Sequence, residues 1–225
     1  MFIIDMQGTL ARATASSRAA SSAIPSGAED ARLRALLDAA EQIFLAKGYH
    51  TATMADVAKA AGMSKKTVYQ LIDSKAELFV ALFNHYQSLL TFPTPQPDWS
   101  AHTILEQNLL CLARFLLSPE QIAIVRLIMT EYTHSPDLGR VFHQNRFKKA
   151  KSRLEVCLTD IARSQNMRLT KVSELAAMLF GMAIGEFHLG VLIGYRPPPT
   201  KTALEKRIHH AVETFLVGCG CGLSE

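Results

Sequence analysis

Apolar residues recur at helical spacing along almost the whole chain, and this rhythm constrains the fold more than any other feature. The first structured stretch shows it in the residues of one helix face, which are Leu33, Leu36, Leu37, Ala40, Ile43 and Phe44. No alternating run of five or six β-branched residues appears in the sequence, so a sheet has no candidate strands. The sequence therefore predicts an all-α protein.

Capping residues divide the second half of the chain into helices. Ser118 and Ser135 each stand before a proline, and a serine cap followed by proline is typical of a helix start. Thr202 and Glu205 have the spacing of a capping box. We expect helices in this half over residues 101–117, 119–134, 136–166, 171–193 and 202–217.

Prolines at positions 93, 95 and 97 interrupt the helical pattern and mark the best candidate for a domain boundary. We expect an N-terminal part of three short helices and a longer C-terminal helical part. The expected divisions are a flexible arm over 1–28, a helix-turn-helix domain over 29–75, a connecting helix with the proline-rich joint over 76–98, and the C-terminal domain over 99–225.

Residues 53–75 have the spacing of a helix-turn-helix. Thr53 can cap the second helix of the chain, Gly62 allows a tight reversal, and Ser64 can cap the third helix. The outward face of that third helix is polar and consists of Lys65, Lys66, Thr67, Tyr69 and Gln70. A helix of this kind can enter the major groove of DNA and touch base edges with its N-terminal residues.

At these residues the chain resembles the TetR family of bacterial transcriptional regulators. The matching residues are Phe44-Leu-Ala-Lys-Gly-Tyr49, Thr53, Val57-Ala58, Ala61-Gly62, Ser64-Lys65, Thr67-Val68-Tyr69, and Ser74-Lys75 with Glu77-Leu78. The resemblance implies DNA contacts from four residues, namely Thr53, Ser64, Thr67 and Tyr69. It also implies that Lys75 neutralises a phosphate, and that the protein is a repressor whose C-terminal helices bind a small ligand and dimerise.

The stretch from Arg126 to Gly139 is similar to the C-terminal domain of AefR-like members of this family. The third helix departs from the family pattern at Lys66, Gln70 and Leu71. Leu71 cannot donate a hydrogen bond to a phosphate, but Lys66 can replace that contact and Gln70 can read an adenine.

The charge distribution favours a DNA-binding dimer over a non-specific DNA binder. The chain has 24 basic and 20 acidic residues, a net charge of +4 that fits almost any partner. Residues 29–90 are balanced, yet four lysines surround the third helix, at positions 59, 65, 66 and 75. So few phosphate contacts predict weak binding by one subunit, and therefore two subunits on adjacent half-sites of double-stranded operator DNA.

The last two helices are the candidate dimer interface. Residues 172–193 are apolar nearly all round and contain small residues that allow close helix approach, and residues 202–217 carry a second apolar face. We expect these two segments to form a four-helix bundle across a two-fold axis.

A ligand pocket is expected among the middle helices, lined by apolar residues that suit a hydrophobic small molecule. The candidate lining residues are Phe115, Met129, Tyr132, Phe142, Met178 and Met182. Glu131 and His188 are the candidates for polar groups in this pocket, and the basic run from Arg146 to Arg153 is expected to be a solvated helix face.

Neither a metal centre nor catalysis is expected. Cys219-Gly-Cys221, with His209-His210 before it, does not complete a tetrahedral ligand set, so we expect no metal and no cofactor. His102, His134 and His143 are scattered and are expected on surfaces. No catalytic motif appears, which indicates that the protein is not an enzyme. The alternatives are an all-α enzyme or cofactor-binding protein with an incidental resemblance, and a DNA binder that needs no ligand.

The sequence also indicates a cytoplasmic protein without a membrane partner. Four cysteines suit a reducing compartment, and the first residues lack the pattern of a secretory signal. Residues 175–193 are long and apolar enough to span a bilayer, but Glu186 and His188 lie near their middle. A helix buried within a protein explains this stretch better.

Overall fold

The computed structural model describes residues 27–135, 138, 148–164 and 169–219, and within these residues the fold is entirely helical. The all-α prediction is confirmed. The elements are α1 (Gly27–Lys47), α2 (Met54–Ala60), α3 (Lys65–Leu71), α4 (Lys75–Ser88), α5 (Ala101–Leu116), α6 (Pro119–Glu131), α8 (Lys148–Ser164), α9 (Val172–Phe180), the π-helical turn η2 (Gly181–Gly185), α10 (Glu186–Leu192) and α11 (Lys201–Gly218). The expected Phe142 lies outside the described residues, as do most of residues 136–147.

Helices α1 to α4 form the N-terminal part around one apolar core. Its fully buried side chains include Leu36, Ala40 and Phe44 of α1, which is the face that the helical rhythm predicts. Four aromatic rings at the crossing of α1 and α4 pack edge to face or tilted, with centroids 5.1–5.9 Å apart, and they are Phe44, Tyr49, Phe79 and Phe83. These contacts hold α4 firmly to the helices that precede it.

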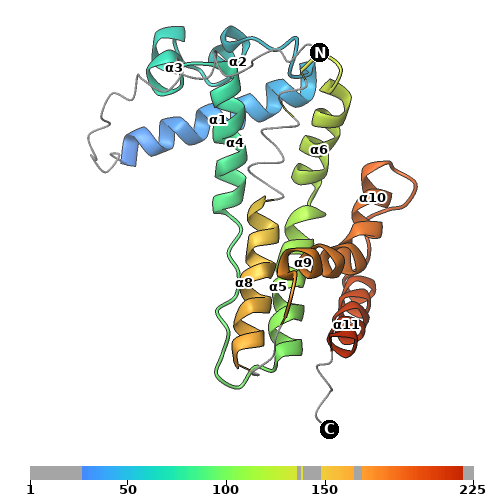
Figure 1. The fold of residues 1–225 in the computed structure, drawn as a ribbon. Coiled ribbons are helices and arrows are strands. Elements are labelled where there is room, and N and C mark those ends of the chain that lie inside the picture. The colour runs from blue at the N-terminus through green and yellow to red at the C-terminus, as the bar shows by residue number, and fades with distance from the viewer. Residues whose placement is uncertain (1–26, 136–137, 139–147, 165–168, 220–225) are drawn as a thin grey trace, which may run out of the picture.

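The remaining helices form a second core, and α4 extends towards it from the first (Figure 1). Buried apolar residues of α5, α8, α9, η2, α10 and α11 make up this second core. Helix α6 is divided between the two parts, because Ile124, Val125 and Ile128 pack into the core of α1 to α4. The chain thus connects its two parts through α4 and through α6.

The described helix starts follow the predicted caps with one exception, and the start expected after Ser135 lies outside the described residues. Ser118 accepts a hydrogen bond of 3.3 Å from the backbone N–H of Gln121, with Pro119 in the first helical position. The predicted capping box of Thr202 and Glu205 is wrong, because Thr200 caps α11 and accepts a hydrogen bond from the N–H of Ala203. A proline disfavours helical geometry in the residue before it. No proline follows Thr200 in this segment, so the helix can begin directly after Thr200.

The long apolar segment is one helical run from Val172 to Leu192, broken in its middle by the π-helical turn at Gly181–Gly185. By length and composition this run is able to cross a membrane, and 44% of its most apolar window is buried inside the molecule. Its buried residues, among them Ala176, Leu179 and Ile184, belong to the second core. One side of the run therefore packs against this core.

Candidate nucleic-acid interface

Helices α2 and α3 are joined by a tight turn that sets their crossing. Gly62 in this turn has φ +65°, a left-handed conformation that costs glycine little and a larger residue much more. The N–H of Met63 reaches back to the carbonyl of Ala58 at 2.9 Å and closes the turn. Val57 of α2 and Val68 of α3 are fully buried beneath it, as the sequence predicts. The outer side of α3 is therefore turned away from the core.

The polar residues predicted for the outer face of α3 do lie on it. Lys65, Lys66, Tyr69 and Gln70 are exposed, and Thr67 is half-buried. Tyr69 leaves 49% of its surface accessible on this face. This face offers ammonium groups, an amide and a phenol to whatever approaches α3.

Thr53 and Ser64 act as helix caps, so their side chains have a structural role in addition to the contacts implied by the family resemblance. Thr53 accepts from the N–H of Asp56 at 3.1 Å, and the Asp56 carboxylate accepts from the N–H of Thr53 at 3.0 Å, which completes a capping box. Ser64 accepts from the N–H of Thr67 at 3.1 Å. Each cap places the start of a short helix at the surface beside the exposed face of α3.

Asp56 also binds Lys47 at the end of α1, with 2.7 Å between Nζ and Oδ1. The hydrogen bond from Lys47, with those from Thr53, lowers the pKa of Asp56 from 3.8 to about 2. This network connects α1 with the start of α2.

Lys75, for which the family resemblance implies a phosphate contact, is bound to the protein backbone at the start of α4. Its ammonium group donates to three backbone carbonyls, those of Tyr49 at 2.7 Å, His50 at 3.0 Å and Ala52 at 2.9 Å. It also lies over the Tyr49 ring, 4.6 Å from the centroid. Partial burial lowers the pKa of Lys75, while the nearby Glu131 opposes that shift. The three donors of Lys75 thus bind the loop between α1 and α2 to the start of α4.

Ser74 caps α4, but its capping box with Glu77 is shifted by one residue. Ser74 accepts from the N–H of Glu77 at 3.1 Å. The Glu77 carboxylate accepts instead from the N–H of Asp73 at 3.2 Å, not from that of Ser74. Both hydrogen bonds join a side chain to the backbone and so fix the start of α4.

Glu131 was expected as a polar group of a ligand pocket, and the structure places it elsewhere. Its Oε2 accepts a hydrogen bond of 3.0 Å from the N–H of His50. Gly48 lies against the same carboxylate with φ +81°, and a Cβ at this position would approach Oε1 to within 2.5 Å. The other expected polar group, His188, is buried in α10. Glu131 therefore belongs to the junction between the two parts of the molecule.

The candidate ligand residues that the structure describes, which exclude Phe142, do not gather around one cavity. Met129 and Tyr132 are exposed at the end of α6, Met178 is exposed on α9, and Met182 packs against the second core. Phe115 lines a hollow of about 580 Å³ whose other lining residues are Leu89, Leu90, Thr91, Phe92, Pro93, Gln107, Cys111 and Arg114. A second hollow of about 480 Å³ lies on the other side of Arg114, against Leu204 and the prolines before α11.

His102 does not lie alone on the surface as expected. It sits beside Glu106, one helical turn away, and beside His209, which the sequence did not associate with it because more than a hundred residues separate the two histidines. His134 is exposed, with its ring 5.4 Å from that of His50. His143 and Cys221 lie outside the described residues, as does Arg146 at the start of the basic run.

An exposed polar recognition helix, presented by a capped and tightly turned pair of helices, defines a helix-turn-helix DNA-binding protein. Two family models together match most of the chain. Residues 36–82 match the tetR family of bacterial regulatory proteins, and residues 103–218 match the C-terminal domain of AefR-like transcriptional repressors. The protein therefore belongs to the TetR family of transcriptional regulators. Members of this family are regulators and not enzymes, so the enzyme alternative is set aside.

Individual relatives agree with this assignment. The transcriptional activator FasR of Mycolicibacterium smegmatis is 42% identical over 57 residues, which is 25% of this chain and 26% of that relative. The match thus spans about a quarter of FasR. The structure of the flavonoid-responsive regulator FrrA superposes with a TM-score of 0.70 at 27% identity, covering 84% of this chain and 97% of that one.

Two further structures share the fold at lower identity. A TetR-family regulator of Mesorhizobium loti has a TM-score of 0.66 at 23% identity, over 84% of this chain and 97% of its own. FadR of Bacillus subtilis, in complex with stearoyl-CoA, has a TM-score of 0.59 at 18% identity, over 82% and 98%.

Proposed function

We propose that this protein is a cytoplasmic, homodimeric repressor that holds double-stranded operator DNA through α3 and releases it when a hydrophobic small molecule binds the C-terminal helices. The observation that carries the proposal is the exposed polar face of α3, with Tyr69 at its centre. Lys65, Lys66, Thr67 and Gln70 supply donors on the same helix. Thr53 and Ser64 contribute phosphate contacts from the surfaces beside it.

Lys75 supports DNA binding in this proposal mainly through the loop it holds. Its three carbonyl contacts fix residues 49–52, directly before the cap of α2. A phosphate that also approaches Lys75 has to share an ammonium whose donors are already used. We therefore assign the direct phosphate contacts to Lys65 and Lys66, which are exposed.

Dimerisation is assigned to the exposed apolar side of residues 172–193 together with residues 202–217. On the first segment Met178, Leu189 and Ile193 are 62%, 55% and 59% exposed. Gly181 and Gly185 lie on the same side, with open space where a Cβ would point. Val217, 59% exposed, extends the apolar surface on α11. A second subunit that covers this side removes large apolar groups from water.

The ligand is assigned to the hollow of about 580 Å³ that touches the segment after α4. Phe115 and Leu90 give it apolar walls, and Arg114 offers a cation to a polar end of the molecule. The flavonoid-responsive FrrA and the stearoyl-CoA complex of FadR are relatives whose ligands have large apolar portions. Of the other expected ligand residues, Met182 packs against the same core, while Met129, Tyr132 and Met178 lie on exposed surfaces.

A ligand in this hollow can influence the DNA-binding part of the molecule through two structural connections. It contacts residues 89–93, which continue directly from α4, and α4 shares a core with α1 to α3. The second connection is α6, whose final residue Glu131 binds the N–H of His50. The ligand shifts the equilibrium only if it binds more tightly to the state in which the two recognition helices are wrongly spaced.

Footprinting of the intergenic DNA beside the protein's own gene tests the proposal. We expect protection of a site with two half-sites centred one helical turn apart, about 34–36 Å. Transcription from a promoter that contains this site should rise when the gene is deleted. Falling transcription would indicate an activator, as FasR is, and the absence of any protected site would contradict operator binding.

A further inference from the structure

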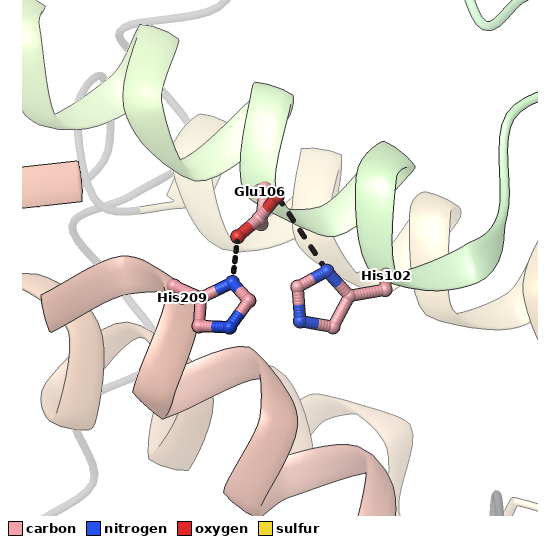
Figure 2. Close-up of side chains that lie close together, drawn as sticks. All are labelled: His102, Glu106 and His209. Atoms are coloured by element: carbon pink, nitrogen blue, oxygen red, sulfur yellow. Dashed lines mark hydrogen bonds and ion pairs between the residues drawn. The ribbon is translucent and has the colours of Figure 1, made fainter. Parts of the chain in front are cut away.

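Three side chains with metal-ligating atoms meet between α5 and α11, away from the DNA-binding face (Figure 2). His102 and Glu106 lie one helical turn apart on α5, and His209 approaches them from α11. The Glu106 carboxylate lies between the two rings. Its Oε1 is 2.8 Å from Nδ1 of His209, and its Oε2 is 3.5 Å from Nδ1 of His102.

We propose that His102, Glu106 and His209 bind a divalent transition-metal ion of the zinc class. Two imidazoles and one carboxylate are a donor set that Zn²⁺, Co²⁺ and Ni²⁺ accept readily. Mg²⁺ and Ca²⁺ prefer oxygen ligands throughout, so a site with two nitrogen donors disfavours them. The ion would join two helices that are far apart in the sequence.

The separations of the donor atoms suit such an ion after a small rearrangement. Zinc bonds of about 2.0–2.1 Å in a tetrahedron place neighbouring donors about 3.3 Å apart. The 3.5 Å between His102 and Glu106 is already close to that value. One ligand atom from each of the three residues lies within 4.8 Å of the others. Rotation of His209, whose side chain is 55% exposed, brings the third donor in without moving either helix.

Replacement of the hydrogen bond from His209 by a bond to the metal ion neither releases nor takes up a proton. Without metal, a protonated Nδ1 of His209 donates to Glu106. When Nδ1 gives its lone pair to the ion, the proton of the neutral imidazole resides on Nε2 instead. The Glu106 carboxylate contributes a negative charge to the site. Thus no further reactant is needed.

The surroundings provide access and a suitable charge. A hollow of about 290 Å³ opens beside the cluster, lined by Glu106, Glu205, Lys206, His209 and His210. Water from this hollow can occupy the fourth position of a tetrahedral ion. Glu205 lies 3.9 Å from both Arg114 and Lys201, so the negative charge that favours a cation at this site comes from Glu106.

The position of the site gives metal binding a mechanical consequence. His102 lies in the first turn of α5, directly after the proline-rich joint that follows α4. His209 lies on α11, one of the two segments assigned to the dimer interface. The ion would therefore tie the start of α5 to the dimerising helix.

Titration of the full-length, chelator-treated and reduced protein with Co²⁺ tests the site. We expect one Co²⁺ per chain, the visible absorption of a tetrahedral nitrogen and oxygen site, and displacement by Zn²⁺. His102→Ala and His209→Ala should each weaken binding by about tenfold or more, since loss of even an outer-shell partner costs that much. His210→Ala is the matched control, because His210 adjoins His209 but pairs with Glu213 at 3.5 Å.

Three results would overturn the proposal. The first is no Co²⁺ binding by the wild-type protein, and the second is an equal loss in the His210→Ala control. The third is an intense thiolate-to-cobalt absorption, which would place the ion on cysteine. Because an alanine variant can fail to fold, Glu106→Gln provides a second test. This change keeps an oxygen acceptor for the histidines but removes the charge, so the variant should fold normally and lose the Zn²⁺-induced rise in Tm.

Discussion

The Glu131 carboxylate, at the last residue of α6, accepts a hydrogen bond of 3.0 Å from the backbone N–H of His50. The carbonyl of the same His50 accepts from Lys75 at the start of α4. One peptide segment between α1 and α2 is thus held from both sides, by α6 and by α4. Both connections between the two parts of the molecule meet directly before the DNA-binding helices.

Removal of the Glu131 carboxylate should release this segment locally. In Glu131→Ala the N–H of His50 loses its acceptor, so we expect its amide hydrogen exchange to accelerate by about tenfold. Glu120→Ala, at the exposed start of the same helix, is the control and should leave this amide unchanged. Equal protection of the His50 amide in wild type and Glu131→Ala would show that the hydrogen bond does not hold the loop.

Lys75→Met should destabilise the fold although it retains most of the side-chain stem. The change removes three hydrogen bonds from a charged donor, two of them part-buried and the one to His50 exposed, and we expect a loss of about 2 kcal/mol in the free energy of unfolding. Lys66→Met, on the exposed face of α3, should change stability by less than about 0.5 kcal/mol. Urea denaturation of both variants measures the difference, and equal midpoints would contradict the structural role of Lys75.

Asp56 should give the N-terminal part a stability that depends on pH. Its pKa is lowered from 3.8 to about 2, so the folded state favours the ionised carboxylate. This contribution is fully present above pH 3.8 and is lost as the pH falls towards 2. Asp56→Asn should therefore melt at a lower temperature than wild type at pH 6, with the gap closing near pH 2.

The control for this pH dependence is Asp98→Asn, which changes an exposed aspartate outside the helices. Its melting temperature should follow that of wild type throughout the same pH range. A constant gap between Asp56→Asn and wild type down to pH 2 would argue that the ion pair with Lys47 contributes nothing.

Charged substitutions on the exposed side of α9 and α10 should break the dimer. Met178→Glu and Leu189→Glu each place a carboxylate where we expect the partner helix to pack, and burial of an unpaired charge is costly. Sedimentation should show these variants as monomers at concentrations at which wild type is a dimer. Val156→Glu, at a comparably exposed position on α8, is the control. Dimers of undiminished affinity in both interface variants would contradict the assignment.

The helices and the outer face of α3 were predictable from the sequence because both depend on short-range patterns. Helical periodicity identified the buried face of α1, and the caps at Thr53, Ser64 and Ser118 marked helix starts correctly. The misassigned cap at Thr202 shows the limit of such signals. Thr200 and Thr202 are both suitable caps by residue type, and the helix begins at the one that directly follows the prolines.

Contacts between distant segments were not predictable in this way. Glu131 pairs with a backbone N–H, which has no sequence signature, and so it was assigned to a ligand pocket. His102 and His209 meet only because α5 packs against α11. The phosphate contact that the family resemblance implies for Lys75 stays a prediction, whereas its hydrogen bonds to three loop carbonyls depend on the tertiary structure and have no sequence signature.

The central claim is that α3 reads operator DNA, and operator affinity of the Tyr69→Ala and Lys66→Ala variants tests it most directly. The measurement is fluorescence anisotropy on the footprinted fragment and on a scrambled fragment, at about 0.15 M salt. We expect each variant to bind the operator about tenfold or more weakly, with Tyr69→Ala losing discrimination against the scrambled fragment and Lys66→Ala weakening on both. Tyr195→Ala and Lys201→Ala, two exposed residues far from α3, should bind as wild type does. Operator affinities of the α3 variants equal to those of these controls would contradict the account.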